Sequence, residues 1–113
     1  LIKLESMVDE QKYQFLMMHH HPLDVGYFMD RHGLENQTQF WQTINKFSSI
    51  KGITCGHVHQ SLTLYSDHTP SIPLFTCPAT SIQFDTSKSS GASNGQGAGY
   101  RIFSLFDDGS ASL

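Results

Sequence analysis

The sequence predicts an α/β fold in which helices flank two sheets, with both mixed and antiparallel strands. Three observations support this prediction. A short apolar run, YQFLMM at 13–18, is typical of a buried strand. Apolar side chains at helical spacing follow within 36–47 and lead into a second short strand. From residue 61 onward, strand-like segments follow one another with turns between them. An α/β layer followed by an antiparallel layer predicts a two-sheet sandwich with its helices outside.

The first half of the chain alternates helix and strand. Residues 1–8 place apolar side chains at helical spacing and predict the end of a helix, followed by a polar turn at 9–12. After the strand at 13–18, residues 22–35 predict a long loop, and such loops often carry function. Asn36 can cap a helix that runs to about Lys46. Ile53 to Cys55 then predict a strand that ends at Gly56.

The second half predicts strands only. Residues 61–65 and 71–76 read as two strands joined by a turn at 67–70. Residues 77–85 continue with a break at Pro78, and residues 86–99 are rich in Ser and Gly and predict a mobile loop. Residues 100–106 alternate as a strand does, 107–110 carry a turn signal, and the last residues predict a returning strand.

Composition narrows the class of protein. The 113 residues suit a single domain or part of one. A net charge of −3 disfavours binding to nucleic acid, and no apolar run approaches the ~20 residues that span a bilayer. Two cysteines are too few for a disulfide framework, which predicts a reduced cytoplasmic protein. Cys55 is expected to be buried and unreactive.

Five of the seven histidines fall into two clusters. In GHVH, His57 and His59 lie two residues apart, so an extended backbone would place both imidazoles on one side. Neutral imidazole is the commonest metal ligand, but this motif alone is weak and fits incidental histidines on a surface turn equally well. The HHHP run allows three interpretations: a tag remnant, solvated imidazoles at a strand end, or a metal ligand. Alternation predicts that His20 faces opposite to His19 and His21, and the spacing does not choose between these two sets.

The two clusters together predict one site. Each follows a short apolar strand, and a helix separates them, as in a unit of two neighbouring parallel strands. The carboxyl ends of such strands lie side by side, where open α/β sheets bind ligands. The clusters are therefore expected to converge on one metal site.

The segments LMMHHHPL, MDRHGLEN, CGHVHQ and CPATSIQF resemble the C-terminal half of the calcineurin-like metallophosphoesterases, and most closely the bacterial cyclic AMP phosphodiesterases. This resemblance implies a sandwich fold and a site with two divalent metal ions, which would be manganese, iron or zinc. It implies hydrolysis of cyclic AMP to AMP by a hydroxide that bridges the metals. His20 and His57 would bind one metal and His59 the other.

The resemblance gives His19 and His21 no metal role, and they are expected either to orient the ligands or to line the pocket. The loop at 22–35 is expected beside the site, so Asp30, His32 and Asn36 are candidates for contacting the nucleotide. Solvation of the loop and capping of the helix by Asn36 are the alternative roles. Residues 77–81 are expected near the pocket edge, although ordinary sheet packing would equally explain Cys77.

The family begins with Asp-x-His, Gly-Asp and Gly-Asn-His motifs, and we expect none of them in this chain. Residues 1–113 are therefore expected to form one partial catalytic domain that is inactive by itself. Two alternatives stay open. One is hydrolysis of glycerophosphodiesters or other phosphodiesters by the same core. The other is a non-catalytic truncation product that forms homo-oligomers through its exposed sheet surface.

Overall fold

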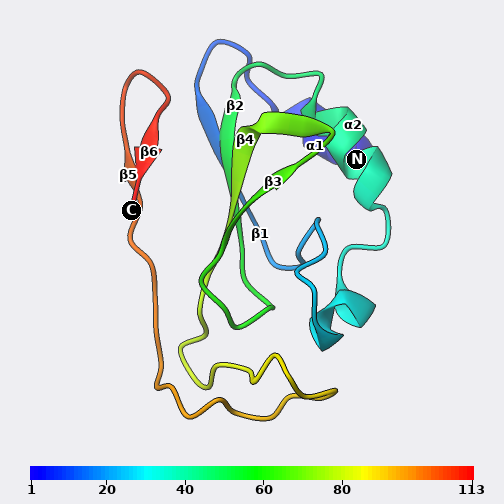
Figure 1. Ribbon diagram of the computed structural model, residues 1–113. Coiled ribbons are helices and arrows are strands. Elements are labelled where there is room, and N and C mark those ends of the chain that lie inside the picture. Colours follow the sequence, from blue (N-terminus) through cyan, green and yellow to red (C-terminus); the bar gives the residue numbers. More distant parts are fainter.

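The computed structural model describes all residues, 1–113, and has a mixed α/β architecture (Figure 1). Its elements, in chain order, are α1 (Ile2–Met7), β1 (Gln14–Met18), the 3-10 helix η1 (Phe28–His32), α2 (Gln37–Ile44), β2 (Ile50–Cys55), β3 (Thr63–Ser66), β4 (Thr69–Thr76), β5 (Ser104–Leu105) and β6 (Ala111–Ser112). The predicted α/β class is confirmed, and so are the helices and strands of the first half, with small shifts at their ends.

Four strands form a mixed sheet in the order β1-β2-β4-β3. β1 runs parallel to β2, and β2 runs parallel to β4, while β3 is antiparallel to β4. Because α2 connects β1 to β2, the predicted strand–helix–strand unit is confirmed. Both strands therefore deliver their carboxyl ends to the same edge of the sheet.

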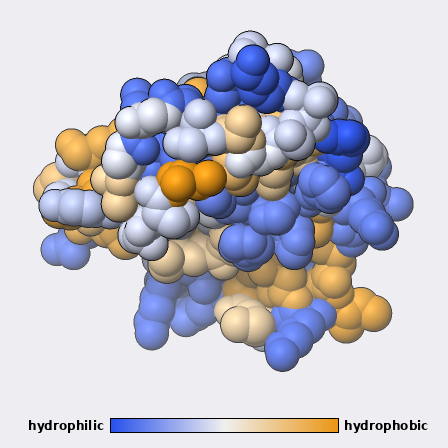
Figure 2. Space-filling view, turned by 90° about the horizontal axis from the view of Figure 1, so that it is seen from below, coloured by the Kyte–Doolittle hydropathy of each residue, from blue (hydrophilic) through white to orange (hydrophobic).

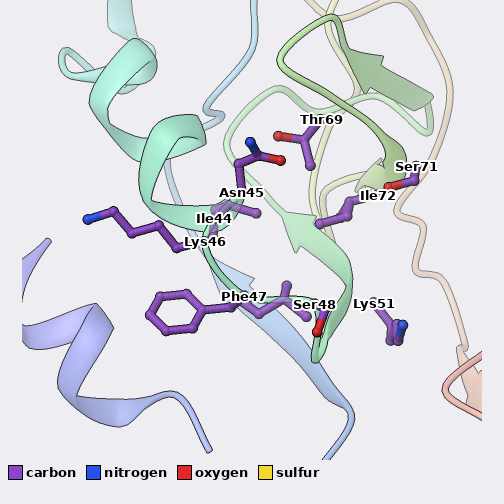
Figure 3. A pocket seen from close by; sticks show the side chains of 10 residues that line it. Ile44, Asn45, Lys46, Phe47, Ser48, Lys51, Thr69, Ser71 and Ile72 are labelled. Atoms are coloured by element: carbon purple, nitrogen blue, oxygen red, sulfur yellow. The ribbon is translucent and has the colours of Figure 1, made fainter. Parts of the chain in front are cut away.

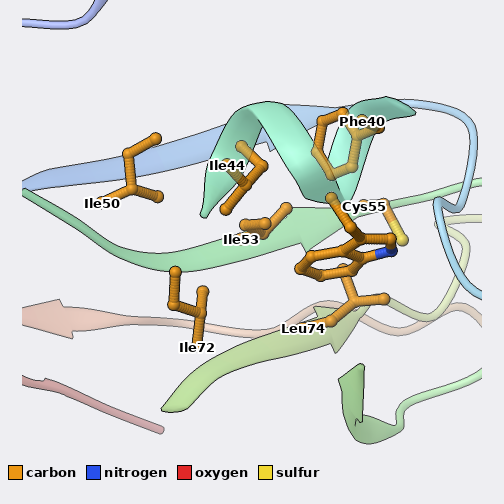
Figure 4. Packing of buried hydrophobic residues seen from close by; sticks show 8 residues of the cluster. Phe40, Ile44, Ile50, Ile53, Cys55, Ile72 and Leu74 are labelled. Atoms are coloured by element: carbon orange, nitrogen blue, oxygen red, sulfur yellow. The ribbon is translucent and has the colours of Figure 1, made fainter. Parts of the chain in front are cut away.

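Helix α2 covers one face of the sheet and supplies much of the core (Figure 4). Trp41 is buried, with 1% of its surface exposed. Its indole Nε1–H donates a hydrogen bond of 2.7 Å to the carbonyl of Pro22. This bond ties the start of the long loop to the helix. The core cluster as a whole contains Phe40, Trp41, Ile44, Ile50, Ile53, Cys55, Ile72 and Leu74.

The predicted strand at 100–106 is wrong for most of its length, because only Ser104 and Leu105 pair, with β6. The residues before them attach to the sheet through side chains. Phe103 lies 5.2 Å from both Phe15 and Phe75, measured between ring centroids. The hairpin β5–β6 forms a separate two-stranded sheet at the end of an extended arm (Figure 1).

Residues 86–99 contain no helix or strand, in agreement with the predicted loop. One isolated bridge joins Phe84 to Ser93, and Asp85 and Ala92 share a backbone hydrogen bond. This long segment lies below the carboxyl ends of the strands in Figure 1. None of the helices has the length and apolar character needed to cross a membrane.

A cavity of about 420 Å³ opens where β2 and β4 begin, at the end of the sheet opposite to the histidines (Figure 3). Its walls combine apolar side chains of the core with two lysines and several hydroxyl groups. The lining residues are Ile44, Asn45, Lys46, Phe47, Ser48, Ile50, Lys51, Thr69, Ser71 and Ile72.

Candidate metal centre

His57 meets the HHHP cluster at the carboxyl ends of β1 and β2, as predicted. His59 does not join this group, because it lies against Ile82 and Phe84 and does not line the cavity beside His20. Met18 and Cys55 are register partners in the parallel pair, so the residues that follow them start side by side. The ring of His57 lies 4.8 Å from the rings of His19 and His20, and 5.9 Å from that of His21, between centroids. The sheet therefore brings imidazoles separated by almost forty residues into one group.

The expected alternation along HHHP is wrong, because β1 ends at Met18 and the histidines follow in a bend. The rings of His19 and His20 lie 5.2 Å apart, and both adjoin His57. The Nε2 atom of His19 is 3.0 Å from Nδ1 of His57, which is a hydrogen-bond distance. His19 thus contacts one expected metal ligand directly.

His21 lies apart from this pair and is fully buried. Its Nε2 atom is 3.3 Å from Oδ1 of Asp30. Burial lowers the pKa of His21, while the neighbouring Asp30 opposes this effect. Because the same carboxylate accepts bonds from the backbone N–H groups of Val25 and Gly26, His21 takes part in fixing the loop that leaves the site.

The GHVH turn has an unusual backbone. His57 and His59 have φ angles of 71° and 55°, which places both in the left-handed region. The extended backbone assumed from the sequence is therefore wrong at this turn. Left-handed conformations cost non-glycine residues free energy and concentrate at functional sites, where the surrounding structure holds them.

Tyr27 holds this turn in place. Its hydroxyl donates a hydrogen bond of 2.6 Å to the carbonyl of Val58, the fully buried residue between the two histidines. Nothing in the sequence singles out Tyr27, because the contact joins two loops that are 31 residues apart. The anchor fixes the middle of the turn, so that the flanking imidazoles project from a rigid backbone.

The environment of His57 favours a neutral ring. Burial, followed by the charges of neighbouring histidines, lowers its pKa. Its Nε2 atom is buried and has no hydrogen-bond partner. An unpartnered nitrogen on a neutral imidazole beside His20 fits the demands of metal ligation.

His59 has different neighbours. Its Nδ1 atom lies 2.7 Å from the carbonyl oxygen of Ile82, and its ring stacks on Phe84 with centroids 3.9 Å apart and planes at 5°. His57 and His59 therefore depend on separate contacts, although only one residue lies between them.

A cavity of about 560 Å³ opens beside the histidine group, and Figure 2 views the end of the molecule where it lies. Hydrophilic residues cover much of this face. His32 and Asn36, two of the three expected nucleotide contacts, line the cavity together with His20 and His57. Arg31 and Glu35 line it as well and were not predicted from the sequence. The complete lining is His20, Arg31, His32, Gly33, Leu34, Glu35, Asn36 and His57.

Asp30, the third expected contact, does not line this cavity. Its carboxylate accepts hydrogen bonds of 2.7 and 2.8 Å from the backbone N–H groups of Val25 and Gly26. Asn36 occupies the N-cap position of α2, but its side chain makes no capping hydrogen bond.

The expectation that the chain contains no Asp-x-His pattern is wrong, because Asp30, Arg31 and His32 form this pattern in the sequence. The segment lies on η1 instead of following a strand. Because Asp30 is engaged by the loop backbone, this segment does not substitute for the Asp-x-His with which the family begins.

The donor atoms present supply only part of a metal site. No group of three or more His, Cys, Asp or Glu side chains in the chain is arranged to hold a metal ion. His20 and His57 offer two neighbouring imidazoles, and the Nε2 atom of His57 is buried without a hydrogen-bond partner. A complete site needs at least one further ligand near this pair.

Comparison with known proteins supplies an independent line of evidence. The chain is 53% identical over 113 residues to a probable cyclic nucleotide phosphodiesterase of Colwellia psychrerythraea, covering 96% of this chain and 43% of that protein. It is 34% identical over 100 residues to the 3',5'-cyclic adenosine monophosphate phosphodiesterase CpdA of Vibrio vulnificus, covering 88% and 35% respectively. The CpdA of Escherichia coli K12 is 32% identical over 100 residues, with the same coverage. No protein-family model matches the chain.

The mixed α/β sheet and the histidine-lined edge are compatible with part of a metallophosphoesterase fold. The chain is homologous to the bacterial cyclic nucleotide phosphodiesterases, and the resemblance seen in the sequence is confirmed. It spans about two fifths of the length of the first of these relatives and about a third of the others described above.

Proposed function

We propose that the chain forms part of a metal-dependent phosphodiesterase that hydrolyses cyclic AMP to AMP. The observation that carries the proposal is the convergence of His20 and His57 on a polar cavity in a chain homologous to cyclic nucleotide phosphodiesterases. The cavity volume of about 560 Å³ falls within the range that suits a small-molecule ligand such as a nucleotide.

In this proposal His20 and His57 hold one divalent cation, and His59 holds a second. Manganese, iron and zinc all accept imidazole ligands. When bound, such ions lower the pKa of water and neutralise charge on a phosphate group. The residues of the chain contribute by holding ligand nitrogens in place, and the buried Nε2 of His57 is the clearest example.

The walls of the cavity suit a nucleotide. Arg31 adds a guanidinium, which is always charged and pairs well with phosphate oxygens. His32 and Asn36 add groups that can hydrogen-bond to the sugar or the base. Their position in the lining of the cavity supports the nucleotide-contacting role expected from the sequence.

The chain by itself is proposed to be inactive, because the ligands present do not complete a site. The test therefore uses a hybrid in which this chain replaces the matching segment of the Colwellia psychrerythraea relative. The purified hybrid, supplied with manganese, is assayed on cyclic AMP and on glycerophosphocholine. Hydrolysis of cyclic AMP by the hybrid and none by the isolated chain supports the proposal.

His20→Ala and His57→Ala are expected to abolish hydrolysis by the hybrid. His68→Ala is the matched control, because His68 is an exposed histidine in the turn between β3 and β4. A hybrid that hydrolyses only glycerophosphocholine would replace the proposed substrate with a glycerophosphodiester. Full activity of both histidine variants would overturn the site.

An exposed apolar surface favours one further property, self-association. β1 forms one edge of the sheet, and Met17 on this strand is 82% exposed. Unpaired strand edges pair readily with other chains. Light scattering of the isolated chain is expected to show a dimer or larger oligomer, and a stable monomer would contradict this.

A further inference from the structure

The hydrogen bond between His59 and Ile82 determines which ring nitrogen carries the proton. A carbonyl oxygen can only accept, so at 2.7 Å the Nδ1 atom of His59 must be the donor. In the neutral ring the lone pair then lies on Nε2. The ring thus presents Nε2 as its acceptor or metal-ligating atom.

Phe84 fixes the plane of the same ring. The two rings lie nearly parallel, at 5°, with centroids 3.9 Å apart. The hydrogen bond directs the Nδ1 edge of the ring toward Ile82, and the stack prevents the ring from tilting about that bond. Two contacts from one short segment therefore set both the rotation and the tautomer of the neutral His59 ring.

Phe84 is itself supported from several sides. Its ring centroid lies 5.2 Å from that of Phe28. A Cβ atom at Gly91 would come within 3.3 Å of the Phe84 ring, so the loop backbone packs tightly against it. The side chain of Gln60 donates a hydrogen bond of 2.8 Å to the carbonyl of Phe84.

The residue that follows Ile82 is Gln83, whose side chain is buried and 4% exposed. The amide of Gln83 accepts from the N–H of Ala79 and donates to the carbonyls of Ala79 and Gly97. One buried amide thus connects both ends of the loop below His59. These hydrogen bonds restrict the backbone around Ile82, whose carbonyl contacts His59.

We propose that Phe84 and the Ile82 carbonyl, in a segment restricted by Gln83, act as positioning groups that keep His59 in its Nδ1–H form with Nε2 directed to a divalent cation. The inference rests on the proposed function, in which His59 is a metal ligand. It adds the segment 82–84 to the site, which the histidine motifs alone do not reveal.

The tautomer is measured directly on the isotope-labelled chain. Long-range proton–nitrogen correlation NMR, recorded well above the ordinary imidazole pKa of about 6.5, separates protonated from unprotonated ring nitrogens. His59 is expected to show a protonated Nδ1 and an unprotonated Nε2. Phe84→Ala and Gln83→Ala are each expected to lose this signature and to show a mixture of both tautomers.

Phe84→Tyr keeps the stacking ring and is expected to retain the Nδ1–H form. Phe106→Ala is the matched control, because Phe106 is an aromatic residue of the C-terminal hairpin that is 52% exposed. Its tautomer spectrum is expected to equal that of the unchanged chain. An amide spectrum of each variant confirms that the fold is intact.

Two results would contradict the proposal. One is an Nε2–H tautomer of His59 in the unchanged chain. The other is an Nδ1–H signature that survives Phe84→Ala unaltered.

This result is independent of the test of the proposed function. An inactive hybrid together with the Nδ1–H signature would refute phosphodiesterase activity while leaving the positioning of His59 established. An active hybrid together with a mixture of both His59 tautomers would support phosphodiesterase activity and refute the positioning of His59.

Discussion

The hydroxyl of Tyr27 donates a hydrogen bond of 2.6 Å to the carbonyl of Val58, which links the loop after HHHP to the centre of GHVH. The bond ties the two histidine segments together outside the sheet. It thereby supports a turn whose flanking residues both have left-handed backbones.

Tyr27→Phe removes this bond and leaves the Val58 carbonyl without its partner. Loss of a single buried hydrogen bond costs about 1–2 kcal/mol, and a decrease of that size in the free energy of unfolding is expected. Urea denaturation followed by Trp41 fluorescence measures it. Tyr65→Phe, at a tyrosine that is 56% exposed, provides the control and should leave the midpoint unchanged.

The same phenol predicts a loss of stability at high pH. Burial, followed by the charge of Asp30, raises the pKa of Tyr27 to about 12. The unfolded chain has an ordinary tyrosine pKa of about 10, so the fold favours the protonated phenol. Its contribution is complete below about pH 10 and is lost as the pH rises through 12.

Denaturation midpoints between pH 9 and pH 12, measured for the chain and for Tyr27→Phe, check this expectation. The two curves should converge toward the upper end of that range, because the phenol has by then lost its advantage. A constant separation across the range would show that Tyr27 titrates normally.

Cys55 and Cys77 are expected to differ in reactivity. Cys55 is 2% exposed, and burial raises its pKa to about 12, so almost no thiolate is available near neutral pH. Cys77 is partly exposed. A thiol reagent should therefore modify one cysteine in the folded chain and both in urea, as measured by mass spectrometry. Rapid modification of Cys55 under native conditions would contradict its burial.

Gly52 is expected to resist substitution. A Cβ atom there would lie 2.7 Å from Cε2 of Phe15, inside the aromatic packing between β1 and β2. The Phe15 ring would have to leave its packed position, and such overpacking costs about 1–3 kcal/mol, so Gly52→Ala should lower the free energy of unfolding by that amount. Gly97→Ala is the control, since a Cβ atom at that position meets nothing within 4 Å.

The sequence predicts the parallel unit because both histidine clusters follow apolar strands and a helical pattern separates them. Local periodicity is sufficient for that step. It is not sufficient for the backbone at His57 and His59, because neither residue is a glycine or asparagine, the types that signal a left-handed turn. The length of the strand predicted at 100–106 was overestimated. The alternation there accompanies packing of the Phe103 side chain, and only Ser104 and Leu105 pair with another strand.

The stacking of Phe84 on His59 could not be predicted from the sequence either. It joins residues 25 positions apart in two irregular segments, where no period relates one side chain to the other. For Asp30, the residue type led to an expectation that the structure does not support. Its residue type suggests a ligand contact, but in the structure its oxygens accept hydrogen bonds from loop N–H groups, which only the folded backbone reveals.

The two histidines of GHVH depend on different parts of the chain. His57 lies against residues that follow β1, whereas His59 is held by the segment beyond β4. Changes at residues 82–84 are therefore expected to alter the surroundings of His59 more than those of His57. A single short turn thus carries two imidazoles whose surroundings can be changed by substitutions in two different parts of the chain.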